Sequence, residues 1–282
     1  MGRYLRPDNL HDALAALRAR PAILAGGTDF YPARLGRSVD EDVLDLGRVA
    51  ALRAIVHEAG PEGGRTLIGA SATWADLLAT PLPPAFRGLR LAAREIGGVQ
   101  IQNAGTLAGN LCNASPAADG VPALLSLSAQ VEVASLDGTR AVALSAFITG
   151  PRRTALAPGE MVTAILVPAA SSRARSTFLK LGARRYLVIS IAMVAVMIDV
   201  AESGVIRRCG IAVGACSAVA QRLTALEFLL VGQPASPALA NALEPAHLEG
   251  LAPIDDVRGT AWYRCDAAAT LVRRALRELL DE

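Results

Sequence analysis

The chain has 282 residues, of which 52% are hydrophobic and 19% are charged, and its formal net charge at pH 7 is +2. This length allows two domains with sizeable cores, and so small a net charge argues against a nucleic-acid partner. The longest apolar run, residues 188–198, is too short to span a bilayer, and residues 1–10 lack the hydrophobic region of a signal peptide. We therefore expect a cytoplasmic protein whose apolar excess lies in well-buried cores or in a large subunit interface.

Residue types that commonly hold metals are few and scattered. None of the four cysteines belongs to a C-x-x-C pair and there are only three histidines, so neither a zinc site nor an iron–sulfur cluster is predicted. The histidines give no support for a catalytic triad either. We expect Cys112, Cys209, Cys216 and Cys265 to be small buried side chains. Lys180 is the only lysine, which singles out its position.

The first thirty residues predict a strand, a helix and a second strand. Residues 3–6 have the pattern of a short strand, and Asn9 has the position of a cap for a helix that runs through Arg18. Residues 22–25 predict a buried strand that leads into the glycine-containing segment 26–29. A turn from a strand into a helix at this point would favour phosphate, because free N–H groups and a helix dipole meet there.

The rest of the chain mixes strands and helices without strict alternation, which predicts an α+β fold. Further strands are expected at residues 43–46, 66–68, 131–133, 162–167, 176–181, 188–200 and 207–213, and further helices at 74–78 (capped by Thr73), 218–230 and 261–280. Residues 168–172 form the expected domain boundary.

The segment of residues 96–127 contains many hydrogen-bonding groups but only one carboxylate, that of Asp119. Its polar groups are amides, hydroxyls and glycine backbone, from Gln100, Gln102, Asn103, Asn110, Asn113, Thr106, Ser115, Gly97, Gly98, Gly105 and Gly109. Such an uncharged polar segment favours a bound cofactor whose phosphates are held by backbone donors. The alternative is a long glycine-rich surface loop, but the run at residues 121–127 has the pattern of a buried helix.

Two common nucleotide-binding motifs are absent from the sequence. There is no G-x-G-x-x-G, which argues against a standard dinucleotide-binding Rossmann domain. The only lysine is followed by Leu181, so no G-x-x-x-x-G-K-[ST] phosphate-binding loop exists. Phosphate recognition, if present, must use the glycine-rich segments described above.

These segments resemble a known family. The sequence AGGTD at residues 25–29, followed by GTLAGN at 105–110 and NASPAAD at 113–119, is similar to the FAD-binding medium subunit of molybdenum hydroxylases, the group that contains bacterial carbon monoxide dehydrogenase and xanthine dehydrogenase. The sequence FLKLG at residues 178–182, followed by two arginines, resembles the start of the C-terminal domain of that family. The resemblance covers the whole chain.

The resemblance implies a division of the chain into two domains. Residues 1–170 would form an FAD-binding domain of the vanillyl-alcohol-oxidase (PCMH-like) type, with subdomains at about 1–54 and 55–170. Residues 171–282 would form a smaller α+β domain of the carbon monoxide dehydrogenase flavoprotein type.

The resemblance also implies one non-covalent FAD and no catalytic side chain or metal ligand in this chain. The family's cofactor-binding positions match Ile23, Leu24, Ala25, Gly26, Gly27, Thr28, Asp29, Phe30, Ile96, Thr106, Gly109, Asn110, Asn113, Asp119 and Lys180. Backbone N–H groups of residues 23–30 and the Thr28 hydroxyl would hold the pyrophosphate, which the second glycine-rich segment would face together with the flavin side.

Three of the implied roles concern single side chains. Ile96 would make an apolar contact, Asp119 would accept hydrogen bonds from the adenosine part of FAD, and Lys180 would reach the flavin and stabilise its reduced, anionic form. Two alternatives are structural, with Asp119 as a helix N-cap and Lys180 as a solvated strand-edge lysine. Covalent attachment of the flavin through Cys112 is a third alternative, although the family binds FAD non-covalently.

In this family, a large molybdopterin subunit oxidises the substrate and a small subunit carries two [2Fe–2S] clusters. The resemblance therefore implies an electron-transfer flavoprotein subunit that takes electrons from those clusters and passes them to an external acceptor, within a dimer of heterotrimers. The cofactor supplies the chemistry and the protein supplies binding and electrostatics. Two other hypotheses are a self-sufficient flavin oxidase and an assembly protein that has lost FAD.

Overall fold

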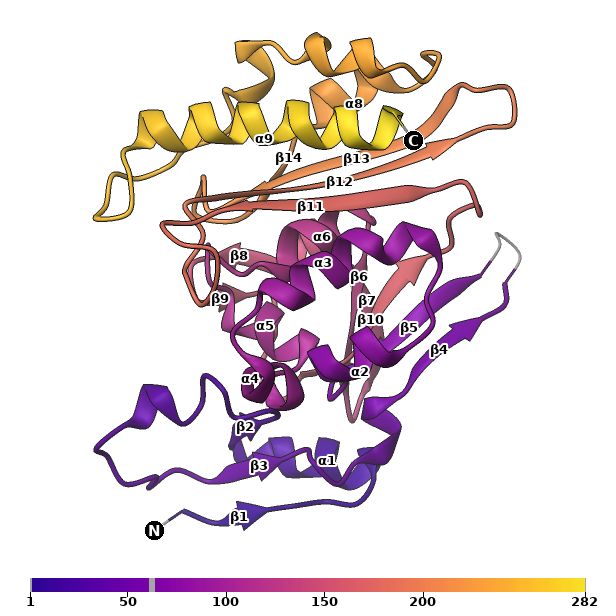
Figure 1. The fold of residues 1–282 in the computed structure, drawn as a ribbon. Coiled ribbons are helices and arrows are strands. Elements are labelled where there is room, and N and C mark those ends of the chain that lie inside the picture. Colours follow the sequence, from indigo (N-terminus) through magenta and orange to yellow (C-terminus); the bar gives the residue numbers. More distant parts are fainter. Residues whose placement is uncertain (1, 61–63, 282) are drawn as a thin grey trace.

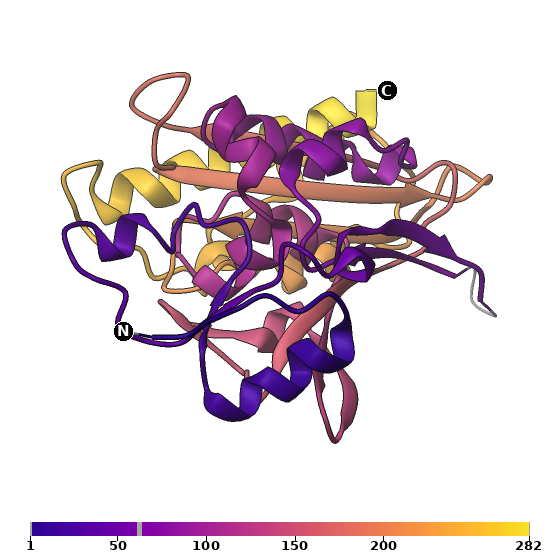
Figure 2. The same ribbon diagram turned by 90° about the horizontal axis from the view of Figure 1, so that it is seen from below.

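The computed structural model describes residues 2–60 and 64–281. Its N-terminal layer is a parallel three-stranded sheet in the order β1-β3-β2, formed by Tyr4–Leu5, Val43–Asp45 and Ala22–Leu24 and packed against helix α1 (Leu10–Ala16). The Asn9 side chain accepts a hydrogen bond from the Asp12 N–H at 2.9 Å, which confirms the predicted cap. Figure 1 shows this layer at the bottom of the molecule, and Figure 2, a view from below, shows it in front of the rest.

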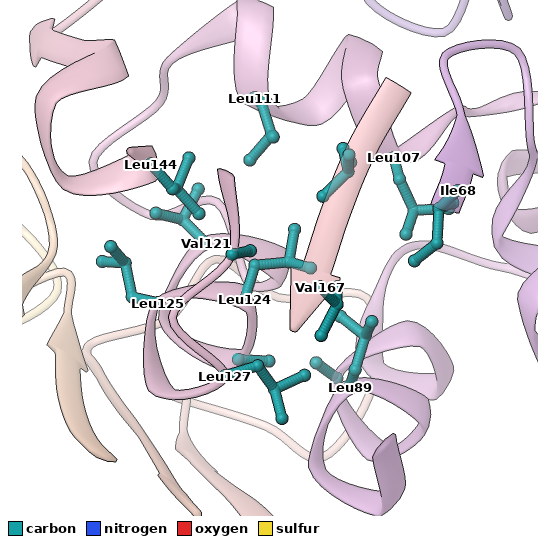
Figure 3. Packing of buried hydrophobic residues seen from close by; sticks show 14 of the residues in the cluster. Ile68, Leu89, Leu107, Leu111, Val121, Leu124, Leu125, Leu127, Leu144 and Val167 are labelled. Carbon is teal, nitrogen blue, oxygen red and sulfur yellow. The ribbon is translucent and has the colours of Figure 1, made fainter. Parts of the chain in front are cut away.

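A five-stranded antiparallel sheet forms the centre of the molecule. Its strand order is β4-β5-β10-β6-β7, formed by Ile55–Glu58, Arg65–Gly69, Met161–Pro168, Gln130–Ser135 and Gly138–Ala143. The helices beside it are α2 (Trp74–Ala79), α3 (Arg87–Glu95), α4 (Val99–Ala104), α5 (Leu107–Asn113), α6 (Gly120–Ser126) and α7 (Leu144–Phe147). Every residue of α6 is buried, and its Val121, Leu124 and Leu125 belong to the hydrophobic core that also contains Val167 of β10 (Figure 3).

The C-terminal sheet is covered by helices on both faces. Its strands are β11 (Arg175–Leu181), β12 (Ala192–Val200), β13 (Ile206–Gly214) and β14 (Gln221–Arg222), all antiparallel and in this order. In β12, Met193 and Met197 face the core that contains α3 and α6, whereas Val194 and Val196 face α8 (Thr224–Leu230) and α9 (Ala261–Asp281). Figure 1 shows α3 and α6 on one side of this sheet and α8 and α9 on the other. Because both faces of β12 are buried, its residues are almost all apolar, and they form most of the apolar run of residues 188–198.

The remaining elements are short. They are the 3-10 turns Leu17–Ala19, Pro32–Arg34, Ala50–Arg53, Pro84–Phe86, Pro237–Ala242 and Pro245–Leu248, and the hairpin strands β8 (Ile148–Gly150) and β9 (Arg153–Thr154). Among the described residues, no helix is both long and apolar enough to cross a membrane. The α+β prediction is confirmed.

Several predicted elements differ from the structure. The predicted helix 218–230 begins only at Thr224, because residues 221–222 pair with β13 as a strand. The predicted strand 188–200 begins only at Ala192. The strand β2 runs into turns and then the 3-10 turn Pro32–Arg34, so no α-helix directly follows residues 26–29. Cys112 is exposed and Cys265 is half-buried, contrary to the expectation that all cysteines are buried.

The polar segment 96–127 is not one loop. It folds into the helices α4, α5 and α6, and its last part forms the buried helix that the pattern of residues 121–127 predicts. The predicted Thr73 cap is also present, since Thr73 and Asp76 form a reciprocal capping box at the start of α2. Local capping chemistry was therefore readable from the sequence.

Candidate functional site

A cavity of about 560 Å³ lies between the turn after β2 and the helices α4 and α5. This volume falls in the range of small-molecule sites. The predicted site residues that line it are Ile23, Ala25, Gly26, Gly27, Thr28, Asp29, Phe30, Ile96, Thr106, Gly109, Asn110 and Asn113. The structure thus brings together the two glycine-rich segments that the sequence singles out. Leu24 is buried outside the lining, in the strand β2.

Gly26 is required by the close approach of the two segments. A Cβ on Gly26 would lie 1.8 Å from the Ala104 carbonyl oxygen, which is backbone and cannot rotate away. Gly27 has a φ of +76°, a left-handed conformation that favours glycine. Both glycines are therefore needed for the shape of this turn, independently of any ligand.

The turn after β2 presents unpaired backbone donors to the cavity. The N–H groups of Gly26, Gly27, Thr28 and Asp29 donate no hydrogen bond to any acceptor in the described part of the chain. Consecutive free N–H groups in a turn form a concave site for anions such as phosphate. In this structure the turn itself supplies these donors, without the helix that the sequence predicts.

The second segment supplies a rigid opposite wall. The Thr106 hydroxyl accepts a hydrogen bond from the Gly109 N–H at 3.0 Å and thereby caps α5. The Asn113 side chain donates to the Asp29 carboxylate at 2.9 Å, and Arg152 donates to the Asn113 carbonyl at 3.1 Å and to its side-chain oxygen. These contacts fix the distance between the two walls.

Asn110 carries an unsatisfied buried acceptor. Its side-chain oxygen is buried and has no hydrogen-bond partner among the described residues, although the residue lines the cavity. Buried polar atoms in native proteins nearly always have a partner. A ligand with a hydrogen-bond donor is a natural partner for this oxygen.

Asp119 and Lys180 lie outside the lining of this cavity and form a buried ion pair. The Lys180 ammonium donates to Asp119 Oδ2 at 2.6 Å, and the two side chains are only 7% and 9% exposed. The Ser190 hydroxyl donates to Asp119 Oδ1 at 2.6 Å. Burial raises the pKa of Asp119, while the charge and the hydrogen bond of Lys180 and the hydrogen bond of Ser190 oppose that rise.

This pair bears on the alternatives for both residues. Asp119 occupies the N-cap position of α6, but its side chain makes no capping hydrogen bond. Lys180 lies on the edge strand β11, yet it is buried rather than solvated. The resemblance assigns Asp119 to the adenosine part of FAD and Lys180 to the flavin, whereas in this structure the two charged groups lie 2.6 Å apart.

Lys180 also lines a second cavity, of about 580 Å³, between α3 and β11. The charged residues around it are Arg94, Glu95, Arg184 and Arg185. Ile96, which lines the first cavity, directly follows Glu95 at the end of α3. The two cavities are therefore lined by adjacent residues of the chain, with Glu95 in the second cavity and Ile96 in the first.

The structure adds lining residues that the sequence analysis missed. Arg34 stacks its guanidinium 3.8 Å from the centre of the Phe30 ring and pairs with Glu41. The others are Ala22, Ala33, Leu46, Ala70, Trp74, Ile101, Ala108, Leu156, Met161 and Val162. The lining also includes Gly105 and Cys112, which the sequence analysis names without counting them among the cofactor-binding positions. The four-residue spacing of Phe30 and Arg34 was a usable signal, whereas β10 reaches the cavity only through the pairing of the central sheet.

Comparisons with known proteins agree with this arrangement. A protein-family model described as "FAD binding domain in molybdopterin dehydrogenase" matches residues 1–170, and one described as "CO dehydrogenase flavoprotein C-terminal domain" matches residues 177–279. The chain is 32% identical to the nicotine 6-hydroxylase medium subunit of Paenarthrobacter nicotinovorans, over 98% of this chain and 96% of the relative. It is also 32% identical to the carbon monoxide dehydrogenase medium chain of Afipia carboxidovorans, over 97% and 94%.

Solved structures show the same fold. A crystal structure of the Cu,Mo-CO dehydrogenase in its cyanide-inactivated form matches with a TM-score of 0.84 and 27% identity, over 99% of this chain and 98% of that chain. Quinoline 2-oxidoreductase from Pseudomonas putida 86 matches with a TM-score of 0.86 at 24% identity, over 100% and 97%. The second likeness concerns the fold alone.

Proposed function

Because the chain belongs to the family of FAD-binding medium subunits of molybdenum hydroxylases, we propose that it is the electron-transfer subunit of such a complex. The chain is the flavoprotein subunit of a molybdopterin-dependent oxidoreductase, and in these complexes the molybdenum and iron–sulfur cofactors belong to other subunits. In the proposed role, electrons arrive from [2Fe–2S] clusters of a small partner subunit and leave to an external acceptor.

The observation that carries the proposal is the set of unpaired N–H groups at Gly26, Gly27, Thr28 and Asp29 on the wall of a cavity of about 560 Å³. A pyrophosphate needs several converging donors and a close backbone approach. The turn offers both, and the unsatisfied Asn110 oxygen offers an acceptor nearby. The residues present therefore fit FAD.

We assign the residues of this chain to three tasks. The turn of residues 26–29 and the Thr28 hydroxyl bind the pyrophosphate, and the Asn113–Asp29 hydrogen bond holds the opposite wall in place. Asp119 and Lys180 act as one charged pair at the flavin end, where the ammonium stabilises negative charge. Bound FAD would supply the acceptance and release of electrons, so no side-chain acid, base or nucleophile is needed.

We also propose the domain division and the partners. Residues 1–170, with subdomains at about 1–54 and 55–170, would bind FAD and residues 171–282 would form the second domain, which the two separate family matches support. The partners would be a small [2Fe–2S] subunit and a large molybdopterin subunit in a cytoplasmic dimer of heterotrimers, since relatives carry names such as "medium chain" and "complex subunit alpha".

One observation favours a second candidate function. A self-sufficient flavin oxidase needs a substrate pocket with titratable groups near the flavin, and the second cavity brings Arg94, Glu95 and Arg184 beside Lys180. This candidate and the electron-transfer role differ in whether the lone subunit reacts with organic substrates.

The proposed cofactor is tested on the purified chain. We expect a yellow protein with one FAD per chain, which acid precipitation releases to the supernatant as FAD. FMN in the supernatant would contradict the assignment of the pyrophosphate site. Flavin that stays with the precipitate would instead indicate covalent attachment, for which the exposed Cys112 in the cavity wall is the available thiol.

A further inference from the structure

The Ser190 hydroxyl provides a second hydrogen bond to the Asp119 carboxylate. One carboxylate oxygen accepts from the Lys180 ammonium and the other accepts from the Ser190 hydroxyl, each at 2.6 Å. Ser190 is 1% exposed, and its partner lies 71 residues earlier in the chain. The three side chains come from the N-cap position of α6, from β11 and from the connection that precedes β12. No motif marks Ser190, which interrupts an otherwise apolar run.

The backbone beside Ser190 is held from two directions. The Ile191 N–H donates to the Leu181 carbonyl at 2.8 Å, which closes the β11–β12 connection at its base. The Ile191 carbonyl accepts from the buried Arg264 guanidinium at 2.7 Å, and that guanidinium also pairs with Asp256 at 2.6 Å. Ser190 therefore has little freedom to move away from the carboxylate.

A buried ion pair depends on such additional hydrogen bonds. Removal of two charges from water costs free energy, and their attraction compensates only if the remaining lone pairs of the carboxylate are satisfied. Without the Ser190 hydroxyl, Asp119 Oδ1 would lose its one donor among the described residues. The carboxylate could then rotate about its side-chain bonds, and the ammonium of Lys180 would follow it.

We propose that Ser190 is a positioning residue of the flavin site, which orients Asp119 and, through it, the Lys180 ammonium. This inference rests on the proposed function, because it assumes that Asp119 and Lys180 contact bound FAD. Ser190 itself would act through the carboxylate rather than on the cofactor. Its effect on the cofactor should therefore disappear when the carboxylate is absent.

The test compares Ser190→Ala with Ser176→Ala in FAD titrations of the apo-protein. Ser176 is a matched control, since it is also 1% exposed and its hydroxyl makes buried hydrogen bonds, to the Ala85 carbonyl and from the Gly88 N–H. We expect Ser190→Ala to raise the dissociation constant of FAD about tenfold, the size expected for a lost hydrogen bond to a charged group. Ser176→Ala should lower the Tm but leave that constant unchanged.

A double-mutant cycle with Asp119→Ala separates positioning from general stability. In the Asp119→Ala background, the addition of Ser190→Ala should change the FAD dissociation constant less than twofold, compared with about tenfold in the wild type. An equal change in both backgrounds, or wild-type affinity in Ser190→Ala, would overturn the inference. If Ser190→Ala does not fold, Ser190→Thr replaces it as the test, because threonine keeps the hydroxyl. FAD affinity below one-third of wild type in folded Ser190→Thr would also count against the positioning role of Ser190.

The outcomes distinguish this inference from the proposed function. If Asp119→Ala itself binds FAD with wild-type affinity, the assignment of Asp119 to the cofactor fails. If Asp119→Ala weakens FAD and Ser190→Ala does not, only the role of Ser190 fails.

Discussion

The Asn113 side chain donates a hydrogen bond to the Asp29 carboxylate at 2.9 Å, although 84 residues separate the two positions. This contact joins the turn after β2 to the end of α5 across the mouth of the cavity. The geometry of the site therefore depends on two segments of the proposed FAD-binding domain that are 84 residues apart, and predictions about the cofactor can be made at either wall.

Gly26→Ala should abolish tight FAD binding. Its Cβ would lie 1.8 Å from the Ala104 carbonyl oxygen, so the turn and the α4–α5 connection must separate and the unpaired N–H groups must move. We expect at least a hundredfold rise in the FAD dissociation constant, about 3 kcal/mol, in titrations of the apo-protein. Gly250→Ala is the matched control, because no atom lies within 4 Å of its added Cβ. Unchanged affinity in Gly26→Ala would show that the turn of residues 26–29 is not the binding site for FAD.

Asp119→Ala should weaken FAD by about ten- to hundredfold, because hydrogen bonds to charged groups contribute roughly 1.5–3 kcal/mol. Thr28→Val should have a smaller effect, through the loss of one hydroxyl. Asp137→Ala, in the exposed β6–β7 hairpin, is the control for charge alone. The measurement is again titration of the apo-protein, and equal affinities for all three variants would contradict the proposed contacts.

Asp199 should make the free energy of unfolding depend on pH in the acidic range. Burial pushes its pKa up, but hydrogen bonds from Ser171 and Arg207 outweigh burial and hold the pKa below the ordinary value of 3.8. A depressed folded pKa stabilises the protein above the unfolded pKa, and this contribution is lost as the pH falls through the folded pKa. Asp199→Asn should thus lower the free energy of unfolding at pH 7. The difference from wild type, measured by urea unfolding, should shrink below pH 3.8, and a difference that grows in acid would contradict this linkage.

The isolated chain should not oxidise the organic substrate of its complex. We expect dithionite to bleach the flavin of the lone subunit, and we expect candidate substrates to bleach it only in the assembled complex under anaerobic conditions. Co-expressed small and large subunits should co-purify with the chain. Rapid bleaching of the lone subunit by an organic substrate would instead favour the self-sufficient oxidase, with the second cavity as its substrate site.

Local features were readable from the sequence because their physical causes span only a few residues. The Asn9 and Thr73 caps bond to N–H groups three residues later, and the pattern of residues 121–127 predicts the buried helix α6. The two glycine-rich segments were also recognisable, since the requirement for glycine at positions 26 and 27 is imposed on the backbone itself. The resemblance to the family, which these glycine-rich segments carry, implied FAD as the cofactor.

Only the tertiary structure decided how distant residues meet. Lys180 pairs with Asp119 across 61 residues because β11 packs against the helical layer that contains α6, and no local pattern encodes that register. For the same reason the sequence did not indicate Ser190, or the absence of a helix after residues 26–29. A short-range hydrogen bond depends only on residues that are close together in the sequence. A buried ion pair between distant residues forms only when the sheet and the helix have packed together.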